Sequence, residues 1–195
     1  MSRSKKKRPI KPKIIFFVEG DTEKAFFISL AQHYRLTATH VIHILNCSGT
    51  DWVDKATSMM KNNPKCKPSD NTQFYIIFDK DNLSQQQIQA MQSKVKRLKG
   101  KGIKCNIGIS NQNFEVWLLA HFKLVTSHSM SSVQLYHELS KCLGQPYKKA
   151  DPVQIEQILS NDKVHNAIAN SKTITPFMYN SQSTDIGTVI TNILS

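Results

Sequence analysis

The sequence predicts an α/β fold of Rossmann type, with a mostly parallel sheet flanked by helices and an α-helical C-terminal portion. Continuous apolar runs alternate with segments of helical pattern through the first 125 residues. Such runs are typical of parallel strands that are buried on both faces, and their alternation with helices indicates crossover connections. With 195 residues, of which 39% are hydrophobic, the chain is long enough for one well-buried domain.

The individual elements follow from these patterns. After the first strand, Gly20 permits a sharp turn, and Asp21 or Thr22 can cap the next helix. The helix before the fourth strand has apolar residues at spacings of three and four. The expected elements, in order, are a strand at 14–18, a helix through Leu30, a strand at 41–45, a helix through Met60, a loop at 62–72, a strand at 74–78, a helix at about 84–99, a strand at 105–109, a helix at 116–122 and three or four later helices without a further strand.

We divide the chain into a basic disordered arm at 1–13, an α/β core at 14–125 and a helical portion at 126–195 packed on the core. The four cysteines contain no C-x-x-C pair, so we expect reduced thiols in a cytoplasmic protein rather than a zinc site or a disulfide framework. No apolar run approaches the ~18 residues of a membrane span, and we expect no membrane partner.

Acidic residues follow three of the expected strands. Glu19 follows the first strand, Asp79 and Asp81 follow the third, and Glu115 comes shortly after the fourth. Ligands of open α/β sheets bind at the carboxyl ends of the strands, so these acids are expected to converge. Converging carboxylates repel one another, and a divalent metal such as Mg²⁺ would most simply neutralise them.

Each acid has a chemical and a structural interpretation. In an extended backbone Asp79 and Asp81 would face the same side and chelate one ion, although an Asp-rich turn is the alternative. Glu19 would act as a metal ligand or general base, and Glu115 would support a second ion. Glu23 could join that second site, or it could only stabilise the first turn of its helix.

Two further polar groups lie near Glu115. The side chains of 110–113 could hydrogen-bond a phosphate, or they could belong to a capped turn before a buried helix. His121 comes six residues after Glu115, which places the two on different faces of a helix. We therefore interpret His121 as a structural histidine.

The net charge of +12 is unevenly distributed. The first thirteen residues contain seven basic residues and no acid, and a second acid-free cluster covers 94–104. Such clusters suit a polyanion, most commonly nucleic acid, although solvated lysines are the alternative. The residues expected to contact phosphates are Lys5, Lys6, Lys7, Arg8, Lys94, Arg97, Lys101, Lys148 and Lys149.

Several motifs resemble those of a known family. The E-G-D-T-E at 19–23, the D-K-D at 79–81 and the later Glu115 resemble a Toprim domain. Ser110-Asn111 followed by F-E-V-W-L-L-A-H-F at 114–122 is similar to the signature of the RloB family. Tyr147-Lys148-Lys149 and the late Ser183-Thr184 also match that family, whereas Gln112-Asn113 departs from its common pattern.

This resemblance implies a Toprim-like fold and a Mg²⁺- or Mn²⁺-dependent endonuclease, with Glu19, Asp79 and Asp81 as its acidic centre. It also implies a role in bacterial antiphage defence, such as abortive infection, with DNA or RNA, including tRNA, as substrate. An ABC-type ATPase is the implied protein partner, and a homo-oligomer is compatible with it. Two alternatives stay open: a non-catalytic subunit that binds nucleic acid or the ATPase, and a Toprim RNA maturase.

Overall fold

The computed structural model describes residues 12–36, 40–45 and 51–195. Four of the predicted phosphate contacts, Lys5, Lys6, Lys7 and Arg8, lie outside this part of the chain. The elements are, in chain order, β1 (Lys13–Val18), α1 (Asp21–His33), β2 (His40–Ile44), α2 (Trp52–Asn62), the 3-10 helix η1 (Pro64–Cys66), β3 (Thr72–Asp79), α3 (Gln85–Gly100), β4 (Lys104–Asn111), α4 (Glu115–Ala120), α5 (Ser132–Leu143), α6 (Pro152–Leu159), α7 (Lys163–Asn170), the 3-10 helix η2 (Lys172–Ile174), β5 (Ser183–Thr184) and α8 (Ile186–Leu194).

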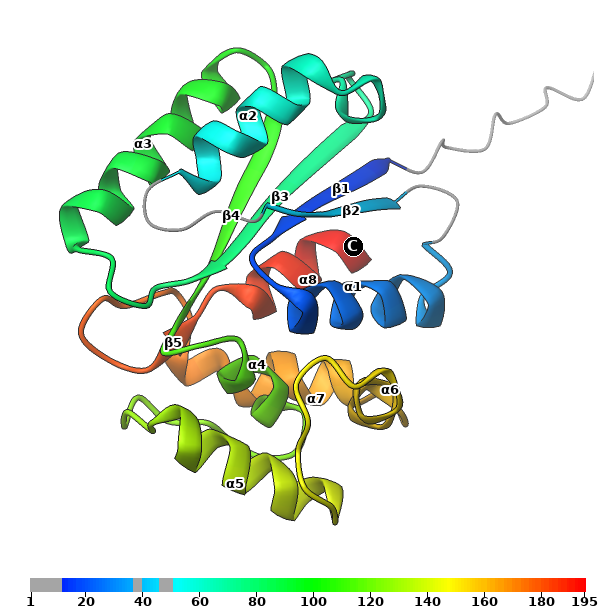
Figure 1. Cartoon of the computed structure of the whole chain (residues 1–195), viewed down its shortest axis with the longest axis vertical. Helices are drawn as coiled ribbons and strands as arrows, with labels where there is room; N and C mark the ends of the chain where they lie inside the picture. The colour runs from blue at the N-terminus through cyan, green and yellow to red at the C-terminus, as the bar shows by residue number, and fades with distance from the viewer. Residues whose placement is uncertain (1–11, 37–39, 46–50) are drawn as a thin grey trace, which may run out of the picture.

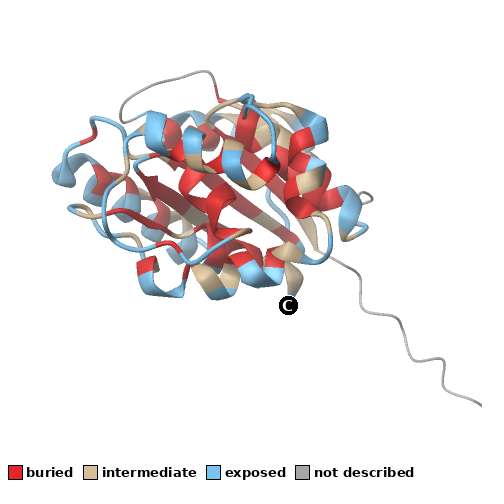
Figure 2. Ribbon diagram, turned by 90° about the horizontal axis from the view of Figure 1, so that it is seen from below, coloured by how far each residue is buried: buried red, intermediate tan, exposed pale blue. Residues whose placement is uncertain are grey.

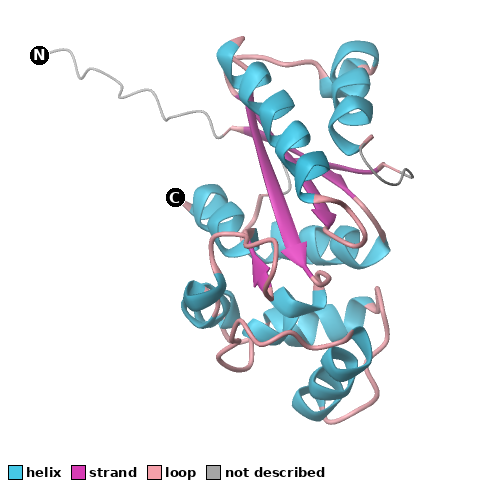
Figure 3. Ribbon diagram, turned by 90° about the vertical axis from the view of Figure 1, so that its left-hand side faces the viewer, coloured by secondary structure: helices cyan, strands magenta, loops and turns pink. Residues whose placement is uncertain are grey.

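The strands form a five-stranded sheet in the order β2-β1-β3-β4-β5 (Figure 1). The first four strands are parallel, and β5 is antiparallel to β4. Helices cover both faces of the sheet, with α2 and α3 on one side and α1 and α8 on the other (Figures 1 and 3). The predicted fold class, a mostly parallel α/β sheet with C-terminal helices, is therefore confirmed.

The continuous apolar runs are explained by burial on both faces of the sheet. Ile15 and Phe17 of β1 join the core under α2 and α3, whereas Ile14, Phe16 and Val18 join the core on the α1 side. Successive residues of a strand point to opposite faces, so each layer of helices needs its own apolar set. Figure 2 shows the buried strands lying between the helical layers.

The helical C-terminal portion shares the core of the α1 face. Leu135 of α5, Ile158 of α6 and Ile190 of α8 belong to the same buried cluster as Phe16 and Trp117. Helix α8 packs against β4, where Gly108 leaves room for Ile186 and Val189. None of the helices in the described part of the chain combines the length and apolarity needed to cross a membrane.

Three local expectations were wrong. Helix α1 begins after Gly20, whose extended backbone occupies the capping position, so neither Asp21 nor Thr22 caps it. The expected loop at 62–72 contains η1, where the side chain of Asn63 accepts a hydrogen bond from the Lys65 N–H. Strand β5 lies in the segment that was expected to be entirely helical.

Candidate active site

An acidic cavity lies where β1, β3 and β4 end. It has a volume of about 440 Å³ and is lined by Glu19, Gly20, Asp21, Thr22, Glu23, Asp79, Glu115, Lys149 and Ala150. Glu19 directly follows β1, Asp79 is the last residue of β3, and Glu115 begins α4 just after β4. The structure thus brings together four of the five predicted site acids, because parallel neighbouring strands end at the same edge of the sheet.

Backbone hydrogen bonds hold these three strand ends together. The Asp79 N–H donates to Glu19 Oε2 over 2.7 Å, and the Asp79 carboxylate accepts a hydrogen bond from the backbone N–H of Phe114. Glu23 lies one turn into α1, and its Oε2 is 3.3 Å from the point where a side chain on Gly20 would begin. A residue larger than glycine at position 20 would therefore crowd the Glu23 carboxylate.

Asp81 does not line the cavity. Strand β3 ends at Asp79, and Asp81 lies in an exposed turn with a φ of 42°. The expected pairing of Asp79 and Asp81 on one side of an extended backbone was therefore wrong in its geometry, since Lys80 already leaves the strand. Asp81 is nevertheless near enough for its charge to contribute to the raised pKa of Glu19, behind the larger effect of burial.

The clustered acids resist ionisation. Burial, followed by the charges of Glu19 and Glu115, raises the pKa of Glu23 to about 7. Burial and the charges of Glu23, Glu19 and Glu115 also hold the pKa of Asp79 well above its usual range. Carboxylates in this arrangement favour protons or cations, because both relieve the repulsion of buried negative charges.

Two residues from the connection between α5 and α6, Tyr147 and Lys149, contact Glu115 beside the cavity. The Tyr147 hydroxyl donates to Glu115 Oε1 over 3.1 Å, and Lys149 Nζ lies 3.8 Å from the same oxygen. Tyr147 also hydrogen-bonds the Thr22 side chain, which links α1 to this connection. Glu115 is only 2% exposed, so these two partners account for a buried carboxylate in an otherwise acidic site.

The motif Tyr147-Lys148-Lys149 therefore contains site residues that the reasoning from strand ends missed. Lys149 was expected only as a phosphate contact, and the structure places it at the cavity wall beside Glu115. Lys148 is exposed and does not line the cavity. Tyr147 was noted in the sequence only as part of the family motif, and that motif was the signal that could have identified it.

The polar residues at the end of β4 serve the fold. Asn111 Nδ2 donates to the carbonyl oxygens of Met178, Tyr179 and Ser181 over 3.2, 2.9 and 2.8 Å. The Ser110 hydroxyl lies 3.0 Å from that of Thr184. These side chains attach the segment around β5 to β4, and this favours their structural interpretation over phosphate binding.

His121 is buried among aromatic rings. Its Nδ1 lies 3.1 Å from the Trp117 carbonyl oxygen, and its ring packs edge-on against Phe26 and Trp117. Burial lowers the pKa of His121 to about 4, so the ring is neutral near pH 7. This environment agrees with the interpretation of His121 as a structural histidine.

The donor set of the cavity suits a divalent cation, because carboxylate oxygens are the ligands that Mg²⁺ and Mn²⁺ prefer. Among the described residues, however, no group of three or more His, Cys, Asp and Glu side chains is already placed to hold a metal ion. Glu19, Asp79, Glu23 and Glu115 would thus have to move closer together to coordinate one.

The fold and the cavity define a class: an α/β protein whose carboxylates gather at the carboxyl edge of a mostly parallel sheet. Comparison with protein families identifies the family within this class. The family described as RloB-like protein matches residues 14–194, nearly the whole chain, and the chain belongs to this family. Comparisons with curated proteins and with solved structures find no match.

Proposed function

We propose that the protein is a metal-dependent nuclease that hydrolyses phosphodiester bonds of nucleic acid at the acidic cavity. The observation that carries this proposal is the meeting of Glu19, Asp79 and Glu115 from three strand ends in one cavity beside Lys149. A bound cation would relieve the repulsion between carboxylates that contributes to the raised pKa values of Glu23 and Asp79. A bound Mg²⁺ or Mn²⁺ would supply activation of water and stabilisation of charge on the phosphoryl group.

The residues of the chain would have distinct tasks in this site. Glu19, Asp79 and Glu115, with support from Glu23, would hold the cation. Glu19 is also placed to accept a proton, because burial raises its pKa and it is fixed by the Asp79 N–H. Lys149, whose side chain is 59% exposed, could pair with a substrate phosphate at the mouth of the cavity.

Family membership supports a more specific role as an effector of antiphage defence, working with an ABC-type ATPase. A second candidate function is a non-catalytic subunit that binds nucleic acid or the ATPase. The observation that favours this second function is the absence of a ready-made metal site among the side chains that the structure describes.

A cleavage assay separates the two functions. Full-length protein would be incubated with mixed tRNA, plasmid and single-stranded DNA in Mg²⁺ or Mn²⁺ and in EDTA. Asp79→Asn is compared with Asp70→Asn, because Asp70 is exposed and lies outside the cavity. We expect metal-dependent cutting that Asp79→Asn reduces by roughly 10²-fold or more and Asp70→Asn leaves unchanged.

A second measurement reports on the cation without relying on cleavage. Mg²⁺ or Mn²⁺ should raise the melting temperature of the wild-type protein and of Asp79→Asn by different amounts, with the smaller rise in the variant. No cutting, with or without the ATPase, together with equal melting shifts in both proteins, would refute the nuclease and favour the non-catalytic subunit.

A further inference from the structure

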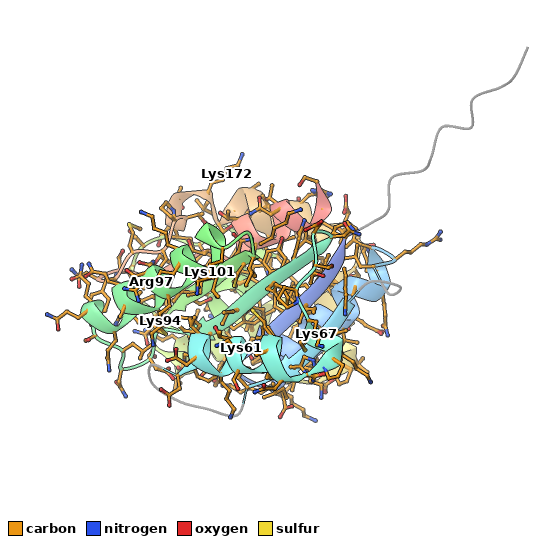
Figure 4. All side chains as sticks on the ribbon, turned by 90° about the horizontal axis from the view of Figure 1, so that it is seen from above. Lys61, Lys67, Lys94, Arg97, Lys101 and Lys172 are labelled. Atoms are coloured by element: carbon orange, nitrogen blue, oxygen red, sulfur yellow. The ribbon has the colours of Figure 1, made fainter. Side chains whose placement is uncertain are left out.

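A basic surface lies on the side of the sheet covered by α2 and α3, away from the acidic cavity. We define it by Lys61 at the end of α2, Lys67 after η1, Lys94 and Arg97 on α3, and Lys101 directly after α3, and refer to it as the α2/α3 basic face. Figure 4 shows these five side chains over the two helices, whereas Lys172 lies apart from them near the C-terminal helices. Only three of the five were predicted from the sequence as phosphate contacts.

The positive charge of this face is mostly unneutralised. Helix α3 contains no acidic residue, and α2 contains only Asp54, whose Oδ2 lies 2.5 Å from Lys94 Nζ. Within the described part of the chain, Lys61, Lys67, Arg97 and Lys101 form no ion pair. A surface that fixes one cation with an acid and leaves four unpaired suits a polyanion.

The ion pair also sets the geometry of the face. Asp54 and Lys94 join α2 to α3, and both helices run opposite to the parallel strands, so they are parallel to each other. Arg97 and Lys101 follow Lys94 on one side of α3, while Lys61 follows Asp54 on α2. The cations therefore line the junction of two adjacent helices over ~10 Å along α3, at a rise of ~1.5 Å per residue.

Other features of α2 and α3 identify the kind of polyanion. The single aromatic residue of the two helices, Trp52, is buried, so the face offers no ring on which an unpaired base could stack. The large exposed hydrophobic side chains of the described residues lie elsewhere, at Leu124, Val133, Val153 and Met178. A protein partner would need such apolar anchors at its interface.

The first half of α3 extends the same surface with hydrogen-bonding groups. The exposed Gln86 lies eleven residues, about three turns, before Arg97 and therefore on the same side of the helix, and the exposed Gln89 lies next to it one turn later. Amide side chains commonly donate to phosphate oxygens and fix the register of a duplex, whereas cations supply most of the affinity. Together these features favour the backbone of a double helix over single strands or an acidic protein.

We propose that the α2/α3 basic face is a second, non-catalytic site that holds the phosphate backbone of double-helical nucleic acid at a distance from the acidic cavity. Helix α3 starts near the carboxyl end of β3 and returns over 16 residues toward the opposite edge of the sheet. At ~1.5 Å per residue, its basic end is ~20 Å or more from the cavity. Under the proposed nuclease function, a substrate would need about six base pairs, at ~3.4 Å each, to reach both sites.

The test is duplex binding in EDTA, so that neither a metal nor cleavage takes part. Binding of full-length protein to labelled 20-base-pair RNA and DNA duplexes would be measured by fluorescence anisotropy over a series of salt concentrations. The variant Arg97→Gln/Lys101→Gln is compared with Lys141→Gln/Lys172→Gln, which removes the same charge from outside the face. Melting temperatures would confirm that both variants are folded.

We expect the variant Arg97→Gln/Lys101→Gln to bind at least one duplex about tenfold more weakly than the wild type does. The slope of log K against log salt concentration should become less steep by about two. Weaker binding to the RNA duplex alone, or to the DNA duplex alone, would identify the duplex that the site prefers. Equal loss in the control variant, an unchanged slope, or displacement of the duplex by polyglutamate as readily as by unlabelled duplex would refute the site. Because the assay in EDTA measures binding without metal or cleavage, failure of the nuclease proposal would leave this result unaffected.

Discussion

Replacing Glu23 with glutamine should stabilise the metal-free protein at alkaline pH. The Glu23 carboxylate is 5% exposed and faces Glu19 and Glu115, and its pKa is raised from 4.5 to about 7. The folded protein therefore binds this proton more tightly than the unfolded chain does. As the pH rises from about 4.5 to 7, the wild-type protein should lose about 3 kcal/mol of unfolding free energy, at ~1.4 kcal/mol for each pH unit.

Glutamine keeps the size of the side chain and cannot ionise. Glu23→Gln should therefore differ little from the wild type below pH 4.5 and be more stable by up to about 3 kcal/mol at pH 8. Urea unfolding followed by circular dichroism in EDTA, at both pH values, measures this difference. The control Glu156→Gln changes an exposed glutamate on α6, and its effect should be within about 0.5 kcal/mol at either pH.

The reasoning would be refuted if Glu23→Gln were no more stable than the wild type at pH 8. The reasoning would also fail if the unfolding free energy of Glu23→Gln fell between the two pH values by as much as that of the wild type. Either outcome would mean that the charge of Glu23 is already compensated in the metal-free cavity, and Glu23 would no longer support the argument that charge repulsion favours cation binding.

Two other substitutions test the packing and the cavity. Gly108→Ala should destabilise the fold by about 1–3 kcal/mol in urea unfolding, because the new Cβ would lie 2.8 Å from Ile77 Cδ1. The control Gly100→Ala should not destabilise it, because no atom lies within 4 Å of the new Cβ there. Equal effects of the two substitutions would contradict the close packing of α8 against Gly108. Tyr147→Phe removes the 3.1 Å hydrogen bond to Glu115 and should slow cleavage by roughly 10- to 100-fold while leaving duplex binding unchanged. An unchanged rate would show that Tyr147 has no part in the chemistry.

The sheet and the position of the cavity were predictable because they depend on local sequence. The apolar runs before Glu19 and Asp79 are short and continuous, as is typical of doubly buried strands, and the rule for strand ends then placed their acids together. Strand β5 was not predictable, since its two residues have no periodicity. It exists because Ser110 and Asn111 of β4 pair with it across more than 70 residues.

The parts of the site that sequence reasoning missed depend on tertiary structure or on one dihedral angle. Asp81 was expected to continue in an extended backbone after the strand, but β3 ends at Asp79 and Asp81 lies in a turn with a positive φ. Lys149 reaches Glu115 only because α5 and α6 fold back onto α4 and α1. No spacing in the sequence encodes that return, although the family motif marked the residues involved.

The contact of Glu115 with Tyr147 and Lys149 has a consequence for the time at which the cavity can form. During synthesis, Glu19, Asp79 and Glu115 are translated before residues 147–149. Until the later segment folds into place, the acids lack the hydroxyl and the ammonium group that face them in the finished protein. Under the proposed function, the cavity would therefore be complete only after residues 147–149 had been made and had folded onto Glu115.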